Sequence, residues 1–202
     1  MHRPRMAAAV LFVSILLVAA AVPAGARIMV VPSADVLRDG TVELRLYNHR
    51  GQTYLSGAAG MLGTLQAEVT GIISSKTELR TALQLAVLRE QQTVPGVALG
   101  VEMQNSRLDF YGVLSKQLGL PGVRGHLAWG SGRFSKGMVG VSYVLNPVQV
   151  NTKAPTMTLG MEYDGRGFNG GIIAQFNPAV SAHVYLSDFQ RLGAGLRYRI
   201  SF

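Results

Sequence analysis

Ionisable side chains recur at alternate positions of this sequence, a spacing that places them on one face of an extended chain. A guanidinium group binds a carboxylate through two parallel hydrogen bonds. Such a face could therefore form a polar path for an anionic solute, or its charges could pair with one another across neighbouring strands. The set with this spacing comprises Glu68, Arg80, Glu102, Arg107, Asp109, Arg124, His126, Glu162, Arg197 and Arg199.

Hydrolytic chemistry is a second reading of the polar residues. His126 and His183 lie in extended segments, and Ser187 follows His183 by four residues on the same face. Nucleophilic catalysis requires a serine, a histidine and an orienting acid in contact, but Asp188 points to the face opposite Ser187. The G-x-S-x-G and H-E-x-x-H patterns are absent. We predict no catalytic residue, and a membrane-embedded lipid hydrolase remains an alternative.

Metal and cofactor sites have little support in the sequence. The chain has no cysteine, which excludes a disulfide scaffold, a thiolate metal site and a cysteine nucleophile. Asp164-Gly165 is a hairpin turn pair. The glycine-rich run 167–171 lies between two extended segments, whereas a phosphate-binding loop would open a helix. No metal and no cofactor are predicted.

The elements that must position these side chains are β-strands, because apolar residues alternate with polar or small ones along most of the chain. Residues 78–91 contain good helix formers, but their alternation favours a strand. The prediction is twelve strands, and ten is the alternative, with residues 27–60 forming a periplasmic N-terminal piece. The twelve are expected near 41–48, 52–58, 63–74, 77–90, 96–104, 107–117, 123–131, 138–145, 156–164, 167–176, 180–187 and 191–202.

The first 26 residues are typical of a secretory signal peptide. Arg3 and Arg5 form a positive start, an apolar run follows from Ala7 to Val22, and Ala24-Gly25-Ala26 provides a small-residue cleavage site. We therefore expect residues 27–202 to form one exported domain. No later apolar stretch reaches the length of a membrane-spanning helix.

The alternating strands are more typical of a transmembrane antiparallel β-barrel than of a soluble sandwich. The chain has only four lysines, and they lie at or near the predicted turns. Aromatic residues fall at strand ends, which predicts two girdles flanking an apolar band. The predicted girdle comprises Phe110, Trp129, Tyr143, Tyr163, Phe168 and Phe176.

Charge and composition fit the same architecture. The formal net charge is +8 and hydrophobic residues make up 48% of the chain, which argues against disorder. Export makes a nucleic-acid partner improbable, so the positive charge is assigned to turns and to the lumen. The chain has 24 glycines. Six of them are expected to make room in a crowded barrel for long neighbouring arginines: Gly100, Gly130, Gly160, Gly171, Gly193 and Gly195.

Five stretches resemble YjbH-like outer-membrane proteins. MTLGMEYDGRGFNGGI (157–172) resembles a hairpin of that family, as does VPGVALGVEMQN (94–105), which YGVLSK (111–116) follows. IMVVPSADVLRDGTVEL (28–44) resembles the family's N-terminal segment, and DFQRLGAGLRYRISF (188–202) its closing strand. The resemblance implies an outer-membrane β-barrel linked to exopolysaccharide production or export, although many family members are several times longer.

These observations predict an outer-membrane barrel with a structural or transport role. A small, anion-leaning pore with no polysaccharide link is the alternative within the same fold. The predicted partners are outer-membrane lipid, the barrel-assembly machinery and, through the resemblance, polysaccharide-export components. The chain ends in the alternating residues Tyr198, Ile200 and Phe202, an ending that resembles the assembly signal of outer-membrane proteins.

Deleting Phe202 tests this assembly signal. We expect the truncated chain to insert poorly into the membrane, because the assembly machinery would lose its terminal aromatic anchor. The fraction of folded protein recovered from the outer membrane measures the effect. Normal insertion of the truncated chain would contradict the role given to the C-terminus.

Overall fold

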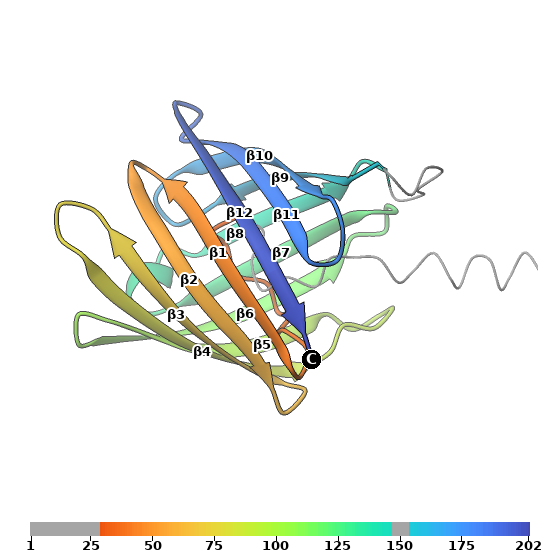
Figure 1. Ribbon diagram of the computed structural model, residues 1–202. Coiled ribbons are helices and arrows are strands. Elements are labelled where there is room, and N and C mark those ends of the chain that lie inside the picture. Colours follow the sequence, from red (N-terminus) through yellow and green to blue (C-terminus); the bar gives the residue numbers. More distant parts are fainter. Residues whose placement is uncertain (1–28, 147–153) are drawn as a thin grey trace, which may run out of the picture.

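The computed structural model describes residues 29–146 and 154–202, which form a closed antiparallel barrel of twelve strands (Figure 1). The prediction of twelve strands is confirmed, and the predicted signal peptide lies outside the described residues. The strands are β1 (Thr41–His49), β2 (Gln52–Met61), β3 (Leu65–Ile73), β4 (Glu78–Leu88), β5 (Gly96–Gln104), β6 (Arg107–Gln117), β7 (Val123–Gly130), β8 (Met138–Val144), β9 (Thr156–Tyr163), β10 (Phe168–Gln175), β11 (Val180–Ser187) and β12 (Arg191–Ser201).

Each strand pairs with its neighbours in sequence, and β1 pairs with β12 to close the ring. The closing register runs from Thr41 opposite Ser201 to Tyr47 opposite Gly195. The segment 78–91, which could have been a helix, supplies β4. Both β1 and β2 lie in the region that the ten-strand alternative left outside the barrel. We refer to the rim where β1 begins and β12 ends as the terminal end, and to the other rim as the opposite end.

The outer face of the barrel is apolar. Leu83, at the middle of β4, is 48% exposed, and Leu99 in β5 is 55% exposed. The predicted girdle residues also lie on this face: Phe110, Trp129, Tyr143, Phe168 and Phe176 are exposed, and Tyr163 packs against Phe168 with ring centroids 5.2 Å apart. Every backbone group of a closed barrel pairs within the sheet, so this surface can face hydrocarbon.

The C-terminal residues follow the same outward alternation. Tyr198, Ile200 and Phe202 are 49%, 38% and 91% exposed. The backbone N–H of Phe202 donates to the carbonyl of Gly40, 3.0 Å away. This bond joins the end of β12 to the residue that precedes β1.

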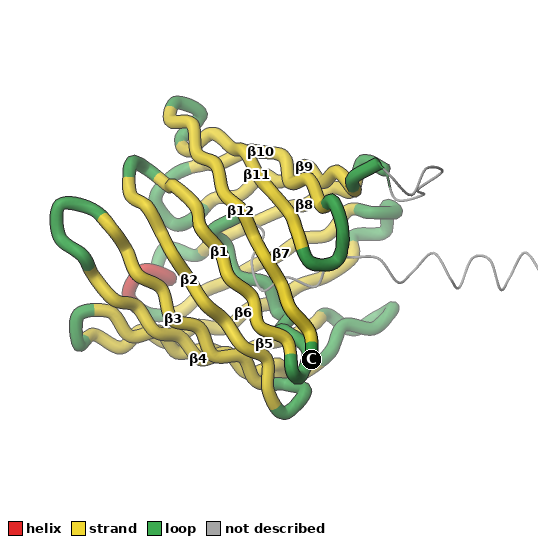
Figure 2. The backbone as a smooth tube through the Cα atoms, viewed as in Figure 1, coloured by secondary structure: helices red, strands yellow, loops and turns green. Residues whose placement is uncertain are grey.

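Residues 29–40, here called the luminal segment, lie inside the barrel rather than in its wall. Figures 1 and 2 show this stretch as an irregular chain between the strands (red-orange in Figure 1, green in Figure 2). Val31, Ala34 and Leu37 are at most 4% exposed. Residues 27–202 were predicted to form the barrel domain, and within that range residues 29–40 fill the interior without contributing a strand to the wall.

Helices contribute little to the described structure. The 3-10 helix η2 (Gly132–Phe134) lies in the connection between β7 and β8. No helix among residues 29–146 and 154–202 combines the length and apolar character that a membrane crossing requires.

Leu83→Arg tests the outward face. We expect this substitution to destabilise the barrel in lipid vesicles by about 2–4 kcal/mol, the cost of an arginine at the bilayer midplane. Leu120→Arg is the matched control, because Leu120 lies in the β6–β7 connection and is 66% exposed. Urea unfolding in vesicles measures both variants, and equal losses of stability would contradict the lipid-facing assignment of Leu83.

Candidate functional site

The inward face carries the ten ionisable residues whose spacing predicted a polar lumen. Nine of them have side chains at most 17% exposed. Arg107 differs, because it lies at the rim where β6 begins; its side chain is 72% exposed and contacts Asp109 at 3.1 Å. The alternation therefore predicted correctly that these side chains face the lumen. Whether each is enclosed depends on its distance from the rim of the barrel.

Glu43 is the centre of a charge cluster on the inner surface of β1 and β12. Its carboxylate lies 2.6 Å from Arg199 Nη2, 3.3 Å from Arg45 Nε and 3.8 Å from Arg197 Nε. Arg45 also reaches Glu68, with Nη2 and Oε2 2.7 Å apart. Three guanidinium groups face two carboxylates here, which leaves one excess positive charge.

Sequence reasoning missed Glu43 and Arg45, although a signal was present. They stand two residues apart in β1, with an apolar residue between them. This is the spacing that identified Arg197 and Arg199 in β12. The register places Glu43 opposite Arg199 and Arg45 opposite Arg197.

A second charge cluster surrounds Glu102 in β5. Arg133 holds this carboxylate with two bonds, Nε to Oε1 at 2.6 Å and Nη2 to Oε2 at 2.8 Å, and Arg80 Nε lies 3.4 Å from Oε1. Arg133 comes from η2, whose Phe134 is fully buried and stacks on Tyr111 at 4.3 Å. Residues 132–137 were predicted only as the connection between two strands, so this inward contact of Arg133 was not expected from the sequence.

Glu162 in β9 holds the start of the luminal segment. Its carboxylate accepts hydrogen bonds from the backbone N–H groups of Val30, at 3.0 and 3.2 Å, and of Val31 at 3.1 Å, with a longer contact of 3.4 Å to Met29. Asn169 Nδ2 donates to the same carboxylate at 3.3 Å. Backbone N–H groups thus take the place of a cation as partners for this buried acid.

Three neutral side chains hold the rest of the segment. Ser115 Oγ in β6 accepts from the N–H of Ala34 at 2.8 Å. Gln84 in β4 donates to the carbonyl of Ser33 at 2.8 Å, and Gln66 in β3 accepts from the N–H of Leu37 at 2.9 Å. These contacts use side chains of three different strands.

Arg124 in β7 makes an ionic contact to the luminal segment. Its Nη2 donates to Asp35 Oδ1 at 2.9 Å, and its Nη1 contacts the second oxygen of the same carboxylate. The guanidinium also bonds to Glu90 in the β4–β5 connection, with Nε 3.0 Å from Oε2. Arg124, which was predicted to face the lumen, therefore joins the wall to its occupant.

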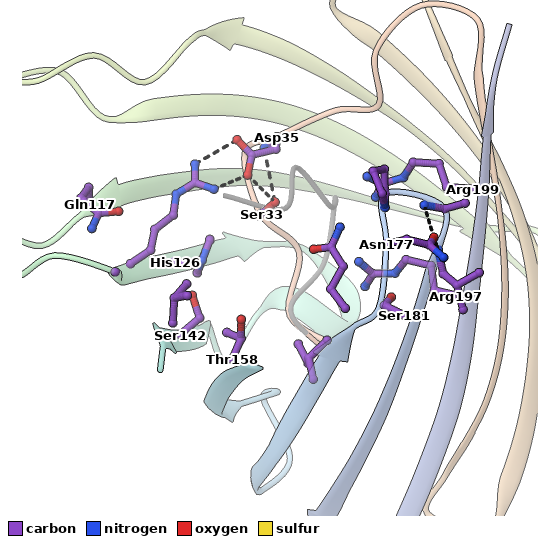
Figure 3. A pocket seen from close by; sticks show the side chains of 18 residues that line it. Ser33, Asp35, Gln117, His126, Ser142, Thr158, Asn177, Ser181, Arg197 and Arg199 are labelled. Atoms are coloured by element: carbon purple, nitrogen blue, oxygen red, sulfur yellow. Dashed lines mark hydrogen bonds and ion pairs between the residues drawn. The ribbon is translucent and has the colours of Figure 1, made fainter. Parts of the chain in front are cut away.

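A cavity of about 70 Å³ remains beside the luminal segment. Its lining contains three guanidinium groups, from Arg124, Arg197 and Arg199, and one carboxylate, from Asp35. Figure 3 shows Arg197 and Arg199 on one side, and Gln117 and His126 on the other. The remaining polar groups of the lining are neutral: Ser33, Ser142, Thr158, Gln175, Asn177 and Ser181.

A serine, a histidine and an aspartate meet near the opposite end of the barrel. Ser187 Oγ lies 3.0 Å from His49 Nδ1, and His49 Nε2 lies 3.3 Å from Asp164 Oδ2. His183, the histidine considered for Ser187 from the sequence, is not this partner, and Asp164 takes the place for which Asp188 was rejected. His49 could not be inferred from strand alternation alone, because its closeness to Ser187 depends on how the barrel closes.

Asp164 is held as an anion in the turn between β9 and β10. Burial alone would raise the pKa of its carboxyl, but His49, the backbone N–H groups of Gly167 and Arg166, and the guanidinium of Arg50 hold that pKa well below its usual range. Arg50 Nη2 also lies 3.0 Å from Asp188 Oδ1. These bonds tie three connections together above Ser187, whose side chain is fully buried.

Four of the six glycines expected to make room for arginines instead lie against aromatic residues: Gly100, Gly171, Gly193 and Gly195. A Cβ added to Gly100 would lie 2.1 Å from the ring of Tyr111, and one added to Gly195 would lie 2.5 Å from the ring of His183. Inward aromatic side chains also stack on one another, as Tyr47 and Tyr54 do at 4.8 Å. Aromatic rings therefore fill space that a wall of small side chains would leave open.

Metal ligation has no candidate in the part of the chain that the structure describes. No group of three or more histidine, aspartate or glutamate side chains there is placed to hold an ion.

Solved structures of porins share this fold. A KdgM porin matches with a TM-score of 0.54 and 12% identity over 80% of this chain and 99% of that one. A KdgM porin in complex with disordered oligogalacturonate matches with a TM-score of 0.55 and 10% identity, with the same coverage. A NanC porin matches with a TM-score of 0.46. No family model and no curated protein matches the sequence. At these identities, the chain shares with the KdgM porins the fold of a membrane β-barrel.

Proposed function

We propose that this protein is an outer-membrane channel for small polar solutes, with a preference for anions. The observation that carries the proposal is the interior: the wall encloses a separate piece of chain and a cavity bordered by three arginines and one acid. The apolar outer face and the likeness to porin barrels support a place in the outer membrane. The predicted export signal is consistent with that place.

The width of the barrel supports a channel over a solid structural barrel. Barrels of about eight strands fill their interior with their own side chains, and the diameter grows with the number of strands. In this twelve-stranded barrel the luminal segment occupies space that the wall does not fill.

The cavity lining supports a preference for anions. Its three guanidinium groups exceed its one carboxylate by two charges, 3 − 1 = 2. Glu43 and Glu90 pair with Arg199 and Arg124 from outside the lining, so the excess of guanidinium groups holds for the surface that a solute would touch. Positive charge inside low-dielectric walls raises the local concentration of anions.

Acidic saccharides are the narrower substrate class that we propose. Arginine forks match carboxylates, and neutral amides and hydroxyls alternate with the arginines around the cavity. The oligogalacturonate of one KdgM complex and the resemblance to YjbH-like proteins agree with this chemistry. The exopolysaccharide role and the polysaccharide-export partners remain predictions.

Arg199→Gln tests the anion preference. We expect the reversal potential in a KCl gradient to move toward cation selectivity, because one of three positive charges leaves the lining while Glu43 keeps Arg45 and Arg197. An acidic oligosaccharide should also block the current less than in the original chain. Bilayer recording measures both effects.

Lys76→Gln is the control for this experiment. Lys76 is exposed in the β3–β4 turn, so this substitution removes one positive charge outside the lumen. Equal shifts in the two variants would show that the arginines of the cavity do not set selectivity. No conductance from any folded form, including variants that weaken the hold on the luminal segment, would refute the channel.

A lipid hydrolase is the second candidate function, and the contact of Ser187, His49 and Asp164 favours it. The placement of the serine argues for a structural role. Ser187 is fully buried on the inner face, whereas lipid lies against the outer face. A nucleophile must reach its substrate, and this one is covered.

A fluorophosphonate probe, which labels activated serines, separates the two roles. We expect the folded protein in vesicles to show no more labelling than Ser187→Ala, since the probe cannot reach the buried oxygen. A serine hydrolase in the same vesicles serves as the positive control. Labelling that disappears in Ser187→Ala would establish the hydrolase.

A further inference from the structure

The luminal segment lies where a solute would have to pass. Its side chains at Val31, Ala34 and Leu37 are buried, and the wall contacts it from β3, β4, β6, β7 and β9. We propose that residues 29–40 are an autoinhibitory plug, which closes the lumen when seated and opens it when displaced. This inference rests on the proposed channel function.

The plug can leave without opening the wall. The ring of strand pairs closes through β1 and β12 and does not include the segment. Side chains of the wall seat the segment: Glu162, Ser115, Gln84 and Gln66 bond to its backbone, and Arg124 bonds to Asp35. In addition, Asp39 of the segment accepts a hydrogen bond from the backbone N–H of Gly63 in the β2–β3 turn. Displacement therefore breaks side-chain contacts and leaves the ladder of the barrel intact.

Glu162 and Arg124 supply the ionisable side chains with which the wall holds the segment. Glu162 gathers three consecutive N–H groups at one end of the segment, and Arg124 holds Asp35 near the middle. Hydrogen bonds with a charged partner are about twice as strong as neutral ones. A substitution that removes either charge should loosen the plug more than removal of a neutral contact.

The plug stays tethered when it leaves, because Gly40 joins it directly to β1. Gly40 has a φ of +67°, a conformation that favours glycine. Gly60 in β2 allows the plug backbone to pass close to the wall, since an added Cβ would lie 2.4 Å from the carbonyl oxygen of Leu37. The link to β1 and the close approach to Gly60 keep the last residues of the plug beside β1 and β2.

A single disulfide can lock the plug in place. The Cβ of Ala34 lies 3.4 Å from the position that a Cβ on Gly96 would take, close to the spacing in disulfides. The chain has no cysteine, so Ala34→Cys with Gly96→Cys can form only this bond within one molecule. We expect the oxidised double variant to lose its conductance in bilayers, and the reduced form to regain it.

The two single variants, oxidised in the same way, are the controls and should conduct like the original chain. Mass spectrometry verifies the bond. Equal conductance of the oxidised and reduced double variant would overturn the plug while leaving the channel function standing. No conductance from the reduced double variant, the original chain and Glu162→Gln would instead refute the channel, and the plug with it.

Glu162→Gln provides a second test that does not depend on the disulfide. The neutral amide keeps the size of the side chain but loses the charge that holds the three N–H groups, so we expect the fraction of open time to rise roughly ten- to hundredfold. A maleimide should also label Ala34→Cys in vesicles faster when Glu162→Gln is present. Unchanged open time and unchanged labelling would overturn the inference.

Discussion

The closed ladder of antiparallel pairs is the constraint on which the rest of this structure depends. Once β12 pairs with β1, every strand has two neighbours, and the sheet has no edge. The alternating side chains are then divided between two environments, an apolar surface outside and an enclosed polar space inside. The outward leucines and the inward arginines are two results of the same closure.

Burying an inward charge in the barrel costs desolvation free energy unless the charge has a partner. The barrel solves this in three ways. Glu43 and Glu102 are surrounded by guanidinium groups, and Asp164 combines a histidine, an arginine and turn N–H groups. Glu162 instead uses the backbone N–H groups of the luminal segment. The occupant of the lumen therefore also satisfies the wall, and its removal has an electrostatic cost.

The wall could be predicted from the sequence almost completely, whereas its interior could not. Alternation is a local property, so the ends of β5, β6 and β11 were predicted to the residue. The inward face of Glu68, Glu102 and Arg197 follows from the same period. The contact of Val30 with Glu162 spans 132 residues, so no local pattern in the sequence indicates it. The contact of His49 with Ser187 depends on ring closure in the same way.

The luminal segment sets an order of events for folding. It precedes β1 in the chain, but its anchor Glu162 lies in β9 and is synthesised more than 130 residues later. The bond between Phe202 and Gly40 then seals the seam at the point where the segment enters the wall. The growing sheet must therefore curl around its own beginning, or the segment must thread into a ring that has already closed. On the first route, the pairing of β12 with β1 fixes what the barrel contains, whereas on the second route the lumen fills after that pairing.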